Sequence, residues 1–182
     1  METPTRVLGG VSVPDTPVIA HALEHVRSAF DPFLFNHAVR SWLFAMRIAQ
    51  VENRPCDAEV VAVGALLHDT GRYVLEAADL AADFARAQGM GGARARVVWH
   101  CVALNSSRSL ALFRDRDAVL CAEGIGLDIH GGFDERISPA DAQGIVDAFP
   151  RLLQGPDLHE LCGGSRVKGS RGDTGPFWPG GR

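Results

Sequence analysis

The chain has 182 residues, of which 46% are hydrophobic and 22% charged, and its formal net charge is −4. This length corresponds to about one domain, and the composition is that of a globular protein rather than a disordered one. No apolar stretch approaches the roughly 20 residues of a membrane span, no signal peptide is visible, and no basic excess is present for nucleic acid. We therefore expect neither nucleic acid nor membrane as a partner, with a homo-oligomer left open.

Periodicity and capping residues predict an all-α fold, since no stretch alternates clearly enough to indicate a strand. We expect residues 1–13 to form an irregular lead-in, residues 14–162 the helical domain, and residues 163–182 a disordered tail rich in glycine and proline. Thr, Asp or Ser caps followed by proline mark several helix starts, and glycine or proline marks most helix ends. The expected helices cover residues 17–30, 32–51, 58–68, 75–88, 93–105, 117–130 and 139–149.

The cysteines and lysines exclude several classes of site. The four cysteines are far apart and contain no C-x-x-C pair, so neither a structural zinc knot nor a disulfide framework is expected. That pattern and the missing signal peptide predict a reducing, cytoplasmic environment. The only lysine, Lys168, lies near the C-terminus, which excludes a Schiff-base or P-loop lysine in the body of the protein.

The pair His68-Asp69 ends the most apolar of the expected helices. Placing a carboxylate at the end of such a run is costly unless it is paired or bound to a metal. Neighbouring side chains on a helix diverge by about 100°, so the two can reach one ion only where the helix ends. Gly71 predicts that end.

A polar stripe on the expected helix 32–51 adds a third candidate. His37 lies there with Arg40 and Ser41 three and four residues later, and Asn36 precedes it. Side chains at this spacing share one helix face. Because the surrounding residues are apolar, we expect this face to point into a pocket.

Asp128 is the fourth candidate, near the end of the expected helix 117–130. Gly124 lies one turn before Asp128, as Gly64 lies one turn before His68. A mid-helix glycine costs up to about 1 kcal/mol relative to alanine. The two glycines therefore indicate close helix packing, which could bring helices together beside a metal.

Three segments carry a resemblance to a known family: F-N-H-A-V-R-S at 35–41, L-L-H-D-T-G at 66–71 and G-L-D-I-H-G at 126–131. Together they resemble the HD-domain superfamily, and the first looks most like its cyanamide hydratase-like branch. The likeness covers about residues 14–155. It implies an all-α bundle with one divalent metal, Zn, Fe or Mn, held by His37, His68, Asp69 and Asp128.

The resemblance also implies a chemistry, in which metal-generated hydroxide attacks a nitrile or cyanamide-like carbon. Asp69 and Arg40 are then the candidate catalytic residues, and Asn36, Arg40 and Asn105 the candidate substrate-binding residues. Asn105 stands where this branch usually has a histidine, and asparagine cannot act as an acid or base near neutral pH. The connection after Gly71 is also shorter than usual, which could leave the pocket more open.

Other functions stay open at this point. An HD-type phosphohydrolase acting on a small phosphoester or nucleotide would need cations for the phosphate oxygens. Oxidative di-iron chemistry would need further histidines between the motif aspartates, where only His100 is present. A degenerate HD fold would act as a binding module. His21, Glu24 and His25 match the H-x-x-E-H pattern of inverted zinc peptidases, but nothing else in the chain indicates that class.

Overall fold

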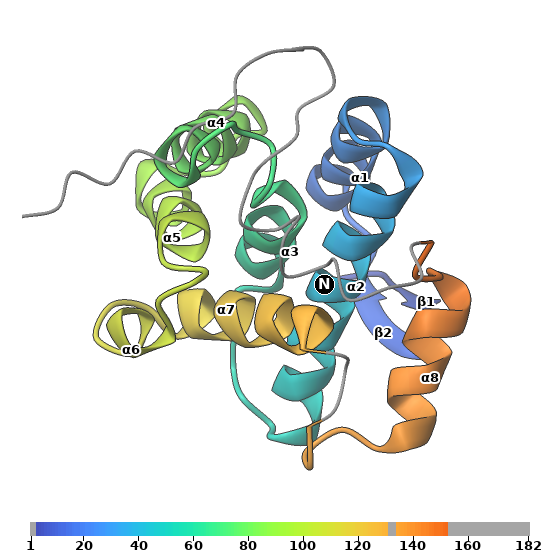
Figure 1. Ribbon diagram of the computed structural model, residues 1–182. Helices are drawn as coiled ribbons and strands as arrows, with labels where there is room; N and C mark the ends of the chain where they lie inside the picture. Colours follow the sequence, from blue (N-terminus) through green and yellow to red (C-terminus); the bar gives the residue numbers. More distant parts are fainter. Residues whose placement is uncertain (1–2, 131–133, 153–182) are drawn as a thin grey trace, which may run out of the picture.

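The computed structural model describes residues 3–130 and 134–152, and within them the fold is all-α apart from one small hairpin (Figure 1). The strands are β1 (Thr5–Leu8) and β2 (Val11–Pro14). The helices are α1 (Pro17–Ala29), α2 (Pro32–Val51), α3 (Ala58–Leu67), α4 (Val74–Ala87), α5 (Gly92–Ala103), α6 (Arg108–Ala111), α7 (Arg116–Ile129) and α8 (Pro139–Ala148). None of these helices is long and apolar enough to cross a membrane. The expected tail at 163–182 lies outside the described residues.

The capping residues start the helices where the sequence predicts. In α1, α2, α3 and α8 the residue before the helix accepts a hydrogen bond from the backbone N–H three residues later. That bond satisfies one of the donors that the first turn of a helix leaves unpaired. The four capping side chains are those of Thr16, Asp31, Asp57 and Ser138.

The expectation of an irregular lead-in is wrong, because β1 and β2 form an antiparallel hairpin with Leu8 opposite Val11. Gly9 and Gly10 make the turn with positive φ angles of 54° and 79°, which glycine adopts without steric cost. Val11 and Val13 are buried in the core. Each strand has only four residues, too few for alternation to stand out in the sequence. The four-residue helix α6 escaped prediction for the same reason.

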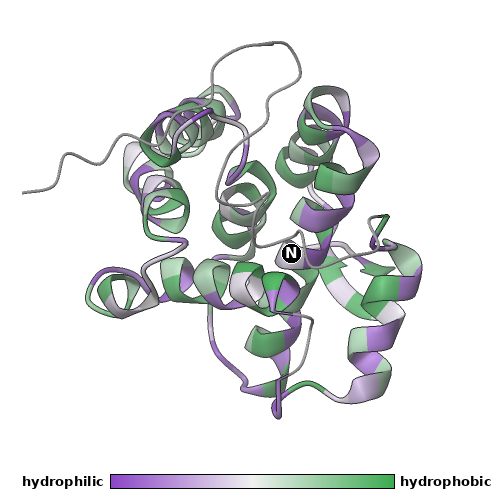
Figure 2. Cartoon of the chain, viewed as in Figure 1, coloured by the Kyte–Doolittle hydropathy of each residue, from purple (hydrophilic) through white to green (hydrophobic). Residues whose placement is uncertain are grey.

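Helix α3 lies at the centre of the molecule, and Figure 2 shows its ribbon as mostly hydrophobic. Residues 60–67 are all buried, and α3 contacts α1, α2, α5 and α7. A helix that is apolar all round has to be buried on every side. Its C-terminal end therefore delivers His68 and Asp69 to the interior.

The two mid-helix glycines mark close helix contacts, as expected. A Cβ atom on Gly124 of α7 would lie 2.3 Å from the backbone oxygen of Ser41 in α2. A Cβ atom on Gly64 of α3 would lie 2.5 Å from the Cβ of Cys101 and 3.2 Å from the Sγ of Cys121. The cysteines within the described residues are free thiols. Glycine therefore sets how closely α7 approaches α2 and how closely α3 approaches α5 and α7.

Asp57 links the start of α3 to α5 and makes stability depend on pH. Its carboxylate accepts hydrogen bonds of 2.7 Å from both Nε and Nη2 of Arg94. Burial opposes ionisation, but these bonds outweigh it and hold the pKa of Asp57 below its ordinary value. Because the folded state binds this proton less tightly than the unfolded state, the stabilisation is present above pH ~3.9 and is lost as the pH falls through the lower folded pKa.

We expect Asp57→Asn to lower the free energy of unfolding by about 1 kcal/mol at pH 7, the upper end for a partly exposed ion pair. Asparagine caps helices as well as aspartate does, so this substitution removes the negative charge and keeps the helix cap. The loss should be smaller at pH 3, where wild-type Asp57 begins to take up a proton. Urea unfolding at the two pH values measures both, with Asp83→Asn, an exposed partner of Arg86, as the control. An equal loss at both pH values would contradict the argument.

Candidate metal centre

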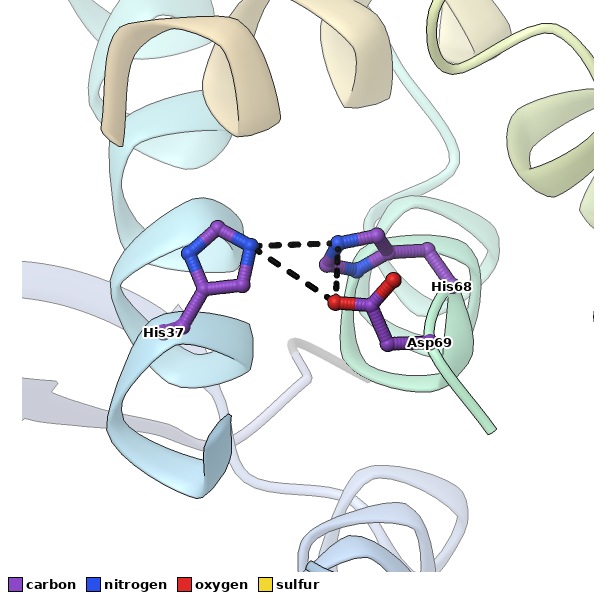
Figure 3. Close-up of side chains that lie close together, drawn as sticks. All are labelled: His37, His68 and Asp69. Carbon is purple, nitrogen blue, oxygen red and sulfur yellow. Dashed lines mark hydrogen bonds and ion pairs between the residues drawn. The ribbon is translucent and has the colours of Figure 1, made fainter. Parts of the chain in front are cut away.

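Three side chains, one from α2 and two from just beyond the end of α3, converge on one point (Figure 3). His37 lies in α2, His68 follows the last residue of α3, and Asp69 comes next. The Nε2 atoms of the two histidines are 3.2 Å apart. The Oδ2 atom of Asp69 is 3.1 Å from Nε2 of His68 and 3.8 Å from Nε2 of His37. These atoms are close enough to ligate a single metal ion.

The far side of the His68 ring shows which nitrogen carries the proton. Its Nδ1 atom lies 2.8 Å from the backbone oxygen of Ala65. A carbonyl oxygen can only accept a hydrogen bond, so in the neutral ring Nδ1 carries the hydrogen. The Nε2 lone pair of His68 therefore points at His37 and Asp69.

The His37 ring is oriented in the same way by a carboxylate. Its Nδ1 atom lies 2.7 Å from Oδ2 of Asp128, and Arg40 donates to both oxygens of that carboxylate. Burial opposes ionisation of Asp128, but the hydrogen bonds from His37 and Arg40 hold its pKa below the ordinary value. An ionised carboxylate only accepts, so the Nδ1–H of His37 donates to it and Nε2 presents its lone pair.

This donor set fits a divalent cation. Two imidazole lone pairs and a carboxylate face one another with no donor between them, an arrangement that needs a proton or a metal ion in the middle. Burial lowers the pKa of His68, but the Asp69 carboxylate outweighs it and the net shift is upward. Burial likewise opposes ionisation of Asp69, and His68 and His37 reverse that effect and lower its pKa. Imidazole nitrogens with a carboxylate are ligands for Zn, Fe or Mn.

Residues 34–104 match the family model of the HD domain. The match supports the HD superfamily without distinguishing its branches, and it contains His37, His68 and Asp69. It covers less than half of the chain and ends before Asp128. The comparison with curated proteins gave no match.

The cluster of His37, His68 and Asp69 is most exposed to solvent on the side of Asp69. The side chains of His37 and His68 are 0% and 3% exposed, whereas that of Asp69 is 22% exposed. Three protein ligands leave coordination positions free, as in catalytic rather than structural metal sites. A substrate would therefore approach past Asp69.

The expected fourth ligand, Asp128, is not part of the cluster of His37, His68 and Asp69. Its Oδ1 atom accepts from Nε of Arg40 at 2.7 Å and lies 2.7 Å from Nη2 of Arg151. Its Oδ2 atom accepts from Nη2 of Arg40 at 2.9 Å and from His37 at 2.7 Å. Three of these contacts, from Arg40 and His37, are hydrogen bonds, and the contact with Arg151 is an ion pair. Asp128 therefore lies behind His37, on the side of the ring away from the cluster.

Arg40 is also placed differently from the expectation that it contacts substrate. Its side chain is fully buried, with Nε and Nη2 on Asp128. Its Nη1 atom donates to the backbone oxygens of Phe149 and Pro150 at 2.9 and 3.3 Å. Four of the five N–H groups of a guanidinium are thus used inside the protein. Arg40 supports the site and does not line its opening.

The other two expected substrate-binding residues stay predictions. The side-chain amide of Asn36, next to His37, donates to the backbone oxygen of Pro150 at 2.9 Å. Asn105 is half-buried in the turn after α5. Within the described part of the chain, no hydrogen bond joins the Asn105 side chain to the cluster.

The H-x-x-E-H motif is not assembled as a metal site. Its two histidines and Glu24 are exposed on α1. Nδ1 of His21 bonds Gln88 at 2.6 Å, and His25 lies against the ring of Phe84. Among the described residues, the candidate metal cluster comprises only His37, His68 and Asp69.

Sequence reasoning missed Arg151. Its Nη1 atom donates to the backbone oxygen of Asp128 at 2.8 Å, and its Nη2 atom lies 2.7 Å from Oδ1 of the same residue. The likeness to the HD superfamily extends to about residue 155, but it assigns no role to Arg151. A charged residue after a helix has no local pattern that indicates its distant partner.

Proposed function

We propose that this protein is a metal-dependent hydrolase or hydratase of the HD type that acts on a small molecule. One observation carries the proposal: His37, His68 and Asp69 converge, and the bonds on the far ring nitrogens leave both imidazole lone pairs for one cation. The HD-domain match supports the same class of function.

The chain supplies an oriented ligand set and one accessible carboxylate. A divalent metal supplies Lewis acidity, which polarises an electrophilic centre and lowers the pKa of water toward neutrality. Asp69 is the ligand nearest solvent, and no described residue hydrogen-bonds its Oδ1 atom. This oxygen is free to orient a water molecule or take its proton, so we assign Asp69 the catalytic role.

The finer proposal is hydration of a nitrile or cyanamide-like group. Phosphate oxygens would need cationic side chains, but the arginines beside Asp128, Arg40 and Arg151, direct their guanidinium groups at that carboxylate. The only lysine, Lys168, lies outside the described residues. This charge pairing favours a small uncharged substrate over a phosphoester.

A substrate panel tests both levels of the proposal. Protein loaded with Zn²⁺, Fe²⁺ or Mn²⁺ would be assayed with cyanamide, small nitriles and phosphoesters. We expect hydration of the uncharged substrates, which a chelator abolishes and the metal restores. Turnover of phosphoesters only would overturn the finer proposal, and a protein without bound metal and without activity would overturn the whole.

We expect Asn105→His to leave metal content unchanged and to give no gain in cyanamide hydration. The three converging ligands are intact, which favours a site tuned to work without a titrating group at position 105. The measurement is kcat/KM for cyanamide in the two proteins. A gain of about 100-fold, the scale of general acid–base catalysis, would instead show that the wild-type site lacks a proton-transfer group.

A further inference from the structure

The carboxylate of Asp128 is the most heavily bonded polar group next to the cluster. Its oxygens contact the guanidinium groups of Arg40 and Arg151 and the Nδ1 atom of His37, each within 2.9 Å. Three of these contacts are hydrogen bonds, two from Arg40 and one from His37, and Asp128 is not among the residues whose ligand atoms converge. The role open to Asp128 is to act on the metal through His37.

The ring of His37 needs such a partner. A free imidazole exchanges its proton between the two nitrogens, and only the form with Nδ1–H presents Nε2 to a metal. An ionised carboxylate on Nδ1 selects that form and fixes the plane of the ring. The side chains of His37 and Asp128 are both 0% exposed, so water does not compete for this bond.

Two guanidinium groups hold the carboxylate in place from different parts of the chain. Arg40 is one turn along α2 from His37 and binds both oxygens. Arg151 follows α8, and it binds the backbone oxygen of Asp128 as well as contacting Oδ1. The backbone bond gives a side-chain donor to a carbonyl in the last turn of α7, where a helix runs out of N–H groups four residues ahead.

The segment at 149–151 is itself anchored over this side of the centre. Arg40 donates to the backbone oxygen of Phe149, and both Arg40 and Asn36 donate to that of Pro150. These bonds bring the backbone of Arg151 to the end of α7. The segment after α8 therefore helps to hold the Asp128 carboxylate against His37.

We propose that Asp128 is a positioning residue, clamped by Arg40 and Arg151, that fixes the His37 tautomer and ring for metal binding. This inference rests on the proposed metal-dependent function and assigns Arg151 a part in it. It predicts that changes to the clamp weaken metal binding without changing the ligands that the bound metal has.

The main test uses Arg151, whose side chain is 21% exposed and whose replacement leaves the Asp128 carboxylate paired with Arg40. We expect Arg151→Met to weaken Zn²⁺ binding by about 10-fold, the lower end of the effect of outer-sphere partners. Arg151→Lys should recover part of the loss, because lysine keeps the charge but not the two-point contact. Competition with a chelator measures the affinities, and Arg96→Met, an exposed arginine of α5, is the control.

Two spectroscopic readouts separate positioning from ligation. The visible spectrum of bound Co²⁺ should be the same in wild type, Arg151→Met and Asp128→Asn, and should change in Asp69→Asn. Nitrogen-15 NMR of the metal-free protein at pH 8 should show His37 with the hydrogen on Nδ1.

Each outcome decides the proposal. A Co²⁺ spectrum that changes in Asp128→Asn as it does in Asp69→Asn would make Asp128 a ligand and overturn the inference. Zn²⁺ affinity within about twofold of wild type in Arg151→Met would remove Arg151 from the clamp, because outer-sphere partners matter by 10-fold or more. If the wild type binds neither Zn²⁺ nor Co²⁺, the proposed function fails. The NMR measurement still tests the tautomer, and a hydrogen on Nε2 of His37 overturns positioning.

Discussion

Replacing Asp69 by alanine is expected to remove nearly all bound divalent metal, from about one ion per chain, the complement of a single ligand set, to trace amounts. Among the residues that the structure describes, Asp69 supplies the one anionic ligand atom within reach of both histidine Nε2 atoms. Loss of an outer-sphere partner already weakens metal binding 10–100-fold, so loss of a direct ligand should weaken it by more than about 100-fold. Elemental analysis of purified protein measures the change.

Two control variants show whether the loss is specific to the cluster. Asp83→Ala removes an exposed carboxylate of α4 and should keep the metal. His21→Ala removes a residue of the H-x-x-E-H motif and should also keep it, because His21 bonds Gln88 and not the cluster. Circular dichroism of each variant would check that it is folded. Full metal occupancy in folded Asp69→Ala would refute the ligand assignment.

Gly124→Ala is expected to destabilise the protein by about 1–3 kcal/mol, the usual range for overpacking a core, although alanine favours a helix by up to about 1 kcal/mol. The new Cβ would lie 2.3 Å from the backbone oxygen of Ser41 and 2.7 Å from the backbone nitrogen of Ala45. Backbone atoms cannot rotate away as a flexible side chain can, so α7 would have to move off α2. The same movement would pull Asp128 from His37.

Gly126→Ala is the matched control two residues along α7. A Cβ atom there meets nothing within 4 Å, so the helix preference of alanine should stabilise the protein by up to about 1 kcal/mol. The two substitutions should therefore have opposite signs in urea unfolding. Their thermal midpoints should move in opposite directions by about 2–4 °C per kcal/mol in a protein of this size. Equal stability of Gly124→Ala and wild type would contradict the proposed close contact.

Much of the fold can be predicted from interactions between residues that are close together in the sequence. A capping side chain acts on a backbone N–H three residues away, so the starts of α1, α2, α3 and α8 can be predicted from Thr, Asp or Ser followed by helix-forming residues. Helix α3 is apolar on every side, and this property predicts both its central position and the burial of His68 at its end. The hairpin and α6 were missed because each element has only four residues.

Three of the candidate metal ligands can be predicted from local patterns, because His68 and Asp69 are adjacent at a helix end and His37 lies on the polar stripe of an otherwise apolar helix. The position of Asp128, in contrast, depends on how distant helices pack. The family resemblance implies that Asp128 binds the metal beside Nε2 of His37. In the structure the crossing of α7 over α2 places its carboxylate at the other ring nitrogen, Nδ1. That crossing depends on backbone contact at Gly124, and the charge balance depends on Arg151 from beyond α8. Local rules reach only a few residues along the chain, and both contacts join residues far apart in it.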